Sequence, residues 1–156
     1  MKIMRGFPCL LLLAAPLVQA APKPGFNGVW TINMTRSEFG AQMAPKKLAL
    51  KIEHKDPILK LQQSETSPLD QEVKFECTYS TTGKEASNNV LGSTVKSVTV
   101  WDGEEIVIHS WSEIAGRKVE FKERWRLTEN GTTLIVDRQG SGLGGLVKQT
   151  LVFDKK

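Results

Sequence analysis

The chain has 156 residues, of which 40% are hydrophobic and 24% charged, and its formal net charge is +4 at pH 7. A chain of this length builds one domain with a substantial core but not two. The charge excess is small and no long block of like charges occurs, so we expect no nucleic-acid partner.

Residues 1–20 have the pattern of a secretory signal peptide. Lys2 and Arg5 precede an apolar run over residues 7–18, which is too short to span a bilayer comfortably, and small residues end the segment. We therefore expect a secreted or periplasmic protein without a membrane span, in which residues 21–156 form a single domain. Cleavage removes Lys2 and Arg5 and lowers the net charge from +4 to +2.

The first strand of the domain is expected around a glycine and a tryptophan two residues apart, Gly28 and Trp30. Gly28 would allow a close approach of the backbone, and Trp30 would point inward and plug one end of the fold. Residues 34–44 follow and are the only segment with any helical character.

Alternation of apolar and polar residues then predicts a series of strands. Residues 46–55 and 58–65 are separated by Asp56-Pro57, which breaks the chain. The clearest strand is 72–80, since every second residue is apolar and would share one face: Val73, Phe75, Cys77 and Tyr79. The polar stretch 81–89 is expected to form a loop at the rim.

Two hairpins are expected in the second half of the chain. Residues 93–101 and 105–114 flank Asp102-Gly103, a dipeptide that suits a two-residue turn because its residues tolerate positive φ. Asn130-Gly131 has the same character and lies between residues 118–127 and 132–139.

The second of these hairpins predicts a register. If Asn130-Gly131 is the turn, Leu127 faces Leu134 and Trp125 faces Val136, so apolar residues meet apolar residues. The same register pairs Glu123 with Arg138 on the inner face. An inward ion pair is costly to desolvate, so it is expected near an open end or beside something bound inside.

The chain ends with a glycine-rich stretch and a last strand. Residues 140–145 are expected to form a loop at the barrel mouth, and residues 146–154 the closing strand. Lys155 and Lys156 would form an ordinary solvated end.

These elements predict an all-β fold. Roughly eight to ten strands follow one another without a long helix between them, which favours an antiparallel up-and-down meander. Such a meander either stacks as two sheets or closes into a barrel. We expect the barrel, because closure removes exposed edges.

The pattern resembles that of the lipocalins and the wider calycin group. The resemblance lies in Gly28-Val29-Trp30, in the meander that follows and in the late Arg138. The chain also resembles small secreted bacterial proteins with lipocalin-like domains. The segments that carry this second resemblance are GVWTIN, SEFG, WDGEEIVI and RWRLTENGTTLIV. It implies that Arg138 packs across the indole of Trp30 and that the barrel binds a ligand. Secreted lipocalins commonly have a disulfide and a C-terminal helix, which this sequence lacks.

Few residues suggest chemistry. Cys77 is the only cysteine after the leader, so it has no intramolecular partner; a buried thiol is expected, with a reactive or intermolecular one as the alternative. His54 and His109 have no further metal ligands at suitable spacing, and no serine lies in a nucleophile elbow. We therefore predict no metal, cofactor or catalytic residue.

The polar side chains expected on the inner face are the candidate ligand-binding residues. They are Tyr79, His109, Trp111, Glu123 and Arg138.

Three classes of function remain open. The first is an extracytoplasmic protein that binds a small hydrophobic or amphipathic molecule without catalysis. The second is a structural or interaction protein whose filled barrel presents a surface to a partner, and the third is a cofactor-free isomerase or cyclase on the same barrel. A connected cavity favours the first over the second, whereas convergent titratable groups inside that cavity would favour the enzyme. The oligomeric state is not predicted.

Overall fold

The computed structural model describes residues 22–156, so the predicted signal peptide lies outside the described residues. The strands, in chain order, are β1 (Gly28–Ile32), β2 (Lys47–Lys55), β3 (Ile58–Thr66), β4 (Glu72–Ser80), β5 (Thr82–Val90), β6 (Ser93–Asp102), β7 (Glu105–Ile114), β8 (Arg117–Thr128), β9 (Thr133–Gly142) and β10 (Gly145–Lys155). A short 3₁₀ turn, η1 (Glu129–Gly131), joins β8 to β9.

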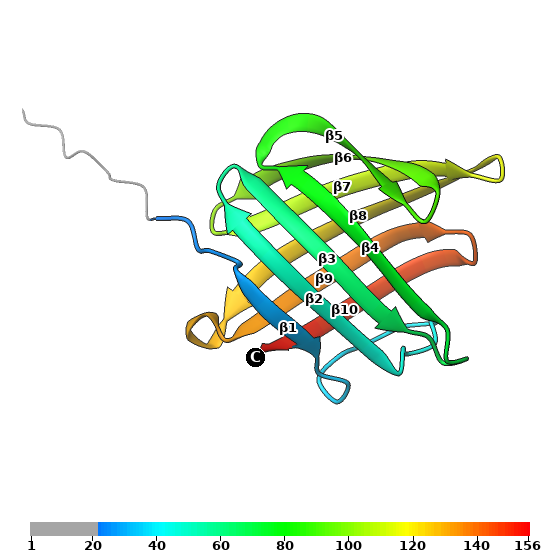
Figure 1. Ribbon diagram of the computed structural model, residues 1–156, viewed down its shortest axis with the longest axis horizontal. Helices are drawn as coiled ribbons and strands as arrows, with labels where there is room; N and C mark the ends of the chain where they lie inside the picture. Colours follow the sequence, from blue (N-terminus) through cyan, green and yellow to red (C-terminus); the bar gives the residue numbers. More distant parts are fainter. Residues whose placement is uncertain (1–21) are drawn as a thin grey trace, which may run out of the picture.

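All ten strands belong to one antiparallel sheet in the order β4-β3-β2-β1-β10-β9-β8-β7-β6-β5. The first strand, β1, therefore lies between β2 and the last strand, β10, and joins the two halves of the chain. Figure 1 shows β1–β4 crossing in front of β6–β9, so that the sheet wraps around a common interior. The predicted all-β, up-and-down, nearly closed barrel is confirmed.

The only break in the sheet is between β4 and β5, which are consecutive in sequence but share no ladder. One side chain spans this break. Asn88 of β5 accepts a hydrogen bond from the backbone N–H of Thr78 at 2.7 Å and donates one to the carbonyl of Thr78 at 3.0 Å. The amide of Asn88 thus takes the place of a peptide group and links the two edges.

The hairpin of β8 and β9 has the predicted register. Leu127 pairs with Leu134, Trp125 with Val136, and Glu123 with Arg138. The connection is longer than the predicted two-residue turn, because β8 ends at Thr128 and β9 begins at Thr133. Asn130 and Gly131 both have positive φ, as the sequence indicated.

Three local predictions are wrong. Residues 34–44 form turns and a single bridge, between Glu38 and Thr150 of β10, and not a helix. The tight turn between β6 and β7 consists of Gly103 and Glu104, one residue later than predicted, since Asp102 pairs with Glu105. Residues 81–89 belong mostly to β5, where only alternate side chains are partly covered.

One end of the barrel is sealed by aromatic side chains. Phe26 and Trp30 are fully buried there, and the indole N–H of Trp30 donates to the carbonyl of Phe26 at 3.0 Å. Trp30 thus plugs one end of the fold, as predicted. The segment that precedes β1 therefore crosses this end and forms the floor of the barrel.

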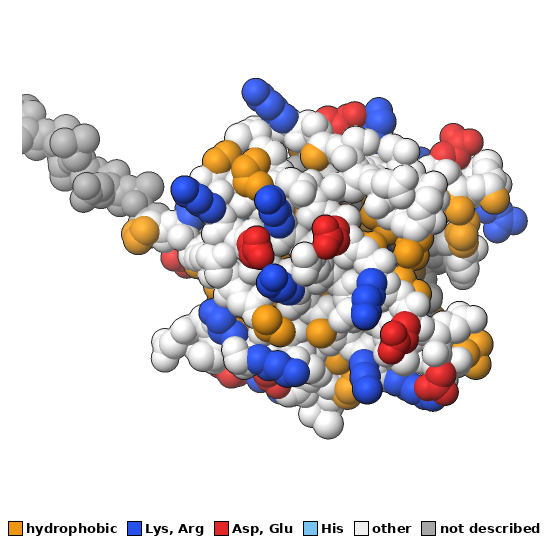
Figure 2. All heavy atoms as spheres, in the orientation of Figure 1, with side chains coloured by type: hydrophobic (Ala, Val, Ile, Leu, Met, Phe, Trp, Pro, Cys, Tyr) orange, Lys and Arg blue, Asp and Glu red, His pale blue; other side chains and the backbone are white. Residues whose placement is uncertain are grey.

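The opposite end is open. Charged side chains are scattered over the outer surface visible in Figure 2, and hydrophobic side chains show inside a hollow on its right-hand side. The mouth of the interior is bordered by Phe39 and Met43 from the segment between β1 and β2, by Leu91 after β5 and by Leu143 after β9. Of the predicted loop 140–145, only Leu143 and Gly144 lie outside the strands, since β9 runs to Gly142 and β10 begins at Gly145; this short turn borders the barrel mouth.

Candidate functional site

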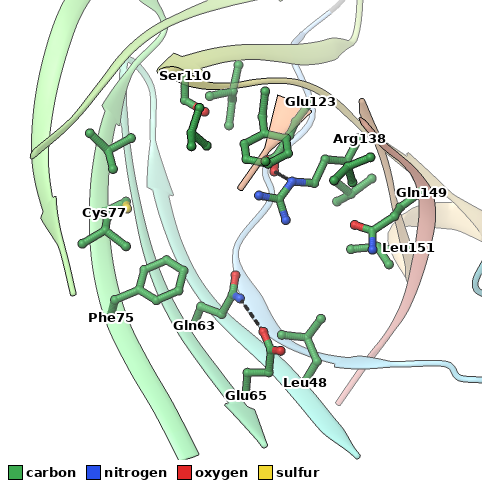
Figure 3. Close-up of a pocket in the computed structure, with 18 of the residues that line it drawn as sticks. Leu48, Gln63, Glu65, Phe75, Cys77, Ser110, Glu123, Arg138, Gln149 and Leu151 are labelled. Carbon is green, nitrogen blue, oxygen red and sulfur yellow. Dashed lines mark hydrogen bonds and ion pairs between the residues drawn. The ribbon is translucent and has the colours of Figure 1, made fainter. Parts of the chain in front are cut away.

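A cavity of about 580 Å³ occupies the barrel interior and opens at the mouth. Its volume is in the roughly 300–1,000 Å³ range of small-molecule sites. Most of its wall is apolar, because period-two alternation directs one face of each strand inward; Leu61, Ile108 and Leu151 are examples. Figure 3 shows the few polar side chains that project into this space.

The main polar feature is a row of three side chains on neighbouring strands. Glu123 of β8 is paired with Arg138 of β9, and Arg138 with Gln149 of β10. Below this row lies the apolar row of Trp125, Val136 and Leu151. We refer to Glu123, Arg138 and Gln149 as the polar row.

Glu123 and Arg138 form the predicted inward ion pair. Nε of Arg138 lies 3.2 Å from Oε1 of Glu123, although this buried nitrogen is not aligned for a hydrogen bond. The second carboxylate oxygen of Glu123 accepts a hydrogen bond from the indole N–H of Trp125 at 3.0 Å. Both oxygens of Glu123 are therefore engaged by side chains of the barrel itself.

The guanidinium of Arg138 is also held on one face. Its central carbon lies 4.0 Å from the ring centroid of Phe121, a cation–π contact. Phe121 is paired with Gly140, where a Cβ would come within 2.0 Å of the carbonyl oxygen of Glu120, so the strands approach too closely for any other residue. In Figure 3 the terminal nitrogens of Arg138 point into the cavity.

Tyr79 and Cys77 line the same cavity from β4. Burial raises the pKa of the Cys77 thiol, an effect that a hydrogen bond with Tyr79 only partly offsets. Burial also raises the pKa of the Tyr79 phenol well above its usual value. Both groups are therefore neutral at physiological pH, and the prediction that Cys77 is buried is confirmed.

Sequence reasoning missed several polar groups of the cavity. Gln63 and Glu65 of β3 project from the wall opposite the polar row, and Nε2 of Gln63 donates to Glu65 at 3.3 Å. Ser110 and Gln149 also line the space. The sequence pattern could have identified them, because each lies at an inward-facing position of a strand whose other inward-facing residues are mostly apolar.

His109 and Trp111 share a face, as expected, but it is the outer one. Their rings lie 5.2 Å apart, and both border a shallow groove outside β6–β9 that also includes Val98 and Val107. Trp111 also borders the cavity, whereas His109 does not. His109 lies 2.6 Å from Glu120. Of the five candidate residues, the structure thus brings together Tyr79, Glu123 and Arg138 inside the barrel.

The cation over Trp30 is not Arg138. Nζ of Lys155 lies 5.2 Å from the indole centroid, and Arg138 instead stacks on Phe121. Lys155 therefore contacts the sealed end, while its side chain remains exposed to solvent, as the sequence indicated. The backbone N–H of Lys156 also donates to the carbonyl of Val29 at 2.9 Å.

A second polar cluster lies in the sealed end, away from the cavity. The backbone N–H of Phe26 donates to Nδ1 of His54 at 3.4 Å, and Nε2 of His54 lies 3.6 Å from Asp56, too far for a hydrogen bond. Asp56 accepts hydrogen bonds from Trp101 at 2.8 Å and from Thr81 at 2.7 Å. Burial lowers the pKa of His54, although Asp56 partly offsets the effect.

Within residues 22–156, no group of three or more His, Cys, Asp or Glu side chains is arranged to hold a metal ion. The same part of the chain includes no helix long and apolar enough to cross a membrane.

The sequence matches no protein-family model and no curated protein. Its fold, by contrast, is similar to that of solved calycin proteins. A secretory abundant heat soluble protein from Ramazzottius varieornatus has a TM-score of 0.63 at 16% identity, covering 88% of this chain and 98% of that chain.

Two further solved structures are similar over most of their length. The fatty-acid-binding protein 1 of Echinococcus granulosus has a TM-score of 0.56 at 14% identity, covering 83% of this chain and 96% of its own. The zebrafish ileal bile acid-binding protein, solved with cholic acid, has a TM-score of 0.53 at 16% identity, covering 84% and 98%. At such identities the likeness establishes the fold alone, an antiparallel up-and-down β-barrel.

Proposed function

We propose that this protein binds a small, partly apolar molecule inside its barrel, outside the cytoplasm and without catalysing a reaction. The proposal rests on the cavity itself, which is connected, open at one end and about 580 Å³ in volume. A cavity with apolar walls and a few convergent polar groups is the usual form of a small-molecule site. The polar row would fix the orientation of the ligand, and the apolar walls would supply most of its buried contact.

The comparisons support the same reading. Among proteins of this fold, one is solved with cholic acid and another is a fatty-acid-binding protein. The extracytoplasmic location is supported by the leader pattern of residues 1–20.

The two alternatives are less well supported. A barrel that served only as a surface would need no open interior, so the cavity argues against a filled core. An isomerase or cyclase would need a free acid or base facing the ligand. Both oxygens of Glu123 are engaged by Arg138 and Trp125, and one oxygen of Glu65 accepts a hydrogen bond from Gln63. Burial holds Cys77 and Tyr79 in their protonated forms, so neither is poised to act as a base.

The proposal is tested by titrating the protein with Nile red, an uncharged dye whose emission increases in apolar surroundings. Ser110→Trp would fill the cavity, whereas Ser87→Trp adds the same volume to an exposed position on β5. We expect the wild type and Ser87→Trp to bind the dye and Ser110→Trp to lose at least about tenfold in affinity. Equal binding by all three, or no binding by any, would contradict the proposal. Native mass spectrometry of protein from its own host would then identify a retained ligand.

A further inference from the structure

The charge of the cavity wall limits which ligands it can accept. Among all residues that line it, the side chains with a formal charge at neutral pH are Glu65, Glu123 and Arg138. Two carboxylates therefore face one guanidinium, and the lining has a net negative charge. Cys77 and Tyr79 add nothing to this balance, because burial keeps both neutral.

The single cation is already matched by a fixed partner. Arg138 is paired with Glu123 at 3.2 Å, and within residues 22–156 this is its only ion pair. Phe121 holds the guanidinium flat at 4.0 Å, and the hydrogen bond from Trp125 holds the carboxylate of Glu123 in place. Neither partner can turn away to leave the other free for a charged ligand without losing these contacts.

Much of the hydrogen-bonding capacity of the cavity is, in contrast, free. The terminal N–H groups of Arg138 point into the space (Figure 3). The amide of Gln63 donates one N–H to Glu65 and that of Gln149 donates one to the carbonyl of Phe39, so each retains a second N–H and its carbonyl oxygen. These groups suit a hydroxyl, an ester or an amide, which can donate, accept or do both. A ligand carboxylate at the polar row would instead lie beside the carboxylate of Glu123, with the wall already negative.

We propose that the ligand of this cavity is an uncharged amphiphile, whose hydroxyl, ester or amide group binds at the polar row while its hydrocarbon part fills the apolar space. This inference rests on the proposed function and deepens it. Glu123 is then a specificity-determining residue, because its charge cancels that of Arg138 and so excludes carboxylates. The ligand class follows from the balance between Glu123 and Arg138 and not from Arg138 alone.

The test compares three ligands with the same hydrocarbon chain, 1-dodecanol, dodecanamide and dodecanoic acid, by displacement of Nile red at neutral pH. In the wild-type protein we expect the alcohol and the amide to bind at least about tenfold more tightly than the acid. In Glu123→Gln we expect the order to reverse, since Arg138 is then free to pair with the carboxylate. Glu76→Gln, which changes an exposed carboxylate on β4 outside the cavity lining, should keep the wild-type order.

A double variant covers the case in which Glu123→Gln fails to fold. Glu123→Gln with Arg138→Gln replaces the ion pair by two amides, so neither member of the pair is left as an uncompensated charge. It should bind the alcohol about as well as the wild type and still bind the acid weakly. Equal or tighter binding of the acid by the wild type would overturn this inference while leaving the binding function intact. Loss of Nile red binding itself would instead overturn the proposed function.

Discussion

Gly28 illustrates at the level of one residue how the sealed end is built. Its φ of +146° is a conformation that side chains disfavour, and a Cβ there would lie 2.7 Å from Cε of Lys155. The glycine thus makes room for the hydrocarbon stem of Lys155, whose ammonium lies over the indole of Trp30. The spacing of Gly28 and Trp30 follows from this contact.

We predict that Gly28→Ala lowers the free energy of unfolding by about 1–3 kcal/mol, because alanine is strained at this φ and displaces the Lys155 stem. Urea unfolding followed by tryptophan fluorescence measures the change. Gly144→Ala is the matched control, since its φ is ordinary and a Cβ there meets no atom within 4 Å. A loss in Gly144→Ala equal to that in Gly28→Ala would show that the strain is not specific to the sealed end.

Prediction from sequence succeeded for residues joined by a local turn and failed for those joined by closure of the barrel. Glu123 and Arg138 are 15 positions apart in one hairpin, so the position of the turn fixed their pairing. Lys155 and Trp30 meet only because β1 pairs with β10, and no local pattern indicates that register. Arg138 lies in the polar row, one row further from the sealed end than Val136, and so stacks on Phe121 instead.

At the scale of elements, β5 shows why a strand can look like a loop. Its residues are almost all polar, because one face is open to solvent and the inner face is only partly covered. Alternation of apolar residues marks a strand only when one face is well buried. Pairing with β6, and not packing into a core, holds this strand in position. In this ladder Ala86 lies opposite Ser97, and Val90 lies opposite Ser93.

The second prediction concerns the break in the sheet between β4 and β5. Asn88→Ala removes both hydrogen bonds to Thr78 and leaves the break in the barrel open, so we expect a loss of about 1–2 kcal/mol in unfolding free energy. Amide exchange of Thr78 should become faster in the same variant, as read by NMR. Ser87→Ala is the neighbouring control, because that exposed side chain points away from β4. Unchanged exchange at Thr78 in Asn88→Ala would contradict the role of the amide as a bridge.

The molecule as a whole has one sealed and one open end. We expect the pH dependence of its stability to originate in the sealed end. Burial lowers the pKa of His54 below its usual value near 6.5. The folded state then keeps this imidazole neutral while the unfolded chain takes up a proton. Protonation would also remove the acceptor of the Phe26 N–H, because Nδ1 would become a donor.

We predict that stability falls as the pH drops below about 6.5, and that the fall ends near the lowered folded-state pKa of His54. Asp56 acts in the same direction at more acidic pH, because hydrogen bonds from Thr81 and Trp101 lower its pKa in the folded protein. Urea unfolding between pH 5 and 7.5 should show the loss in the wild type. His54→Gln should reduce the loss, and His109→Gln should not. A loss that is the same in His54→Gln would place its origin elsewhere.

The general fold could be predicted from the sequence because the inward stripes on β2, β4 and β8 are regular. The contents of the cavity could be predicted only in part. Glu123 and Arg138 were found through their hairpin, whereas Gln63 and Gln149 line the cavity from β3 and β10, which lie far apart in sequence. On β7 the sequence does not show which alternate residues face inward, because Ile106, Val107 and Ile108 are all buried. The prediction therefore placed His109 on the wrong face.

The pairing of β1 with β10 has a consequence for the order of events during biosynthesis. The first strand gains its second neighbour only after β10, which spans Gly145–Lys155, has left the ribosome. Until then β1 and β9 each expose an edge, and the growing polypeptide cannot complete its cylinder. The finished shape is thus acquired only once β10 has been made, and a chain truncated before β10 would form an open, aggregation-prone sheet.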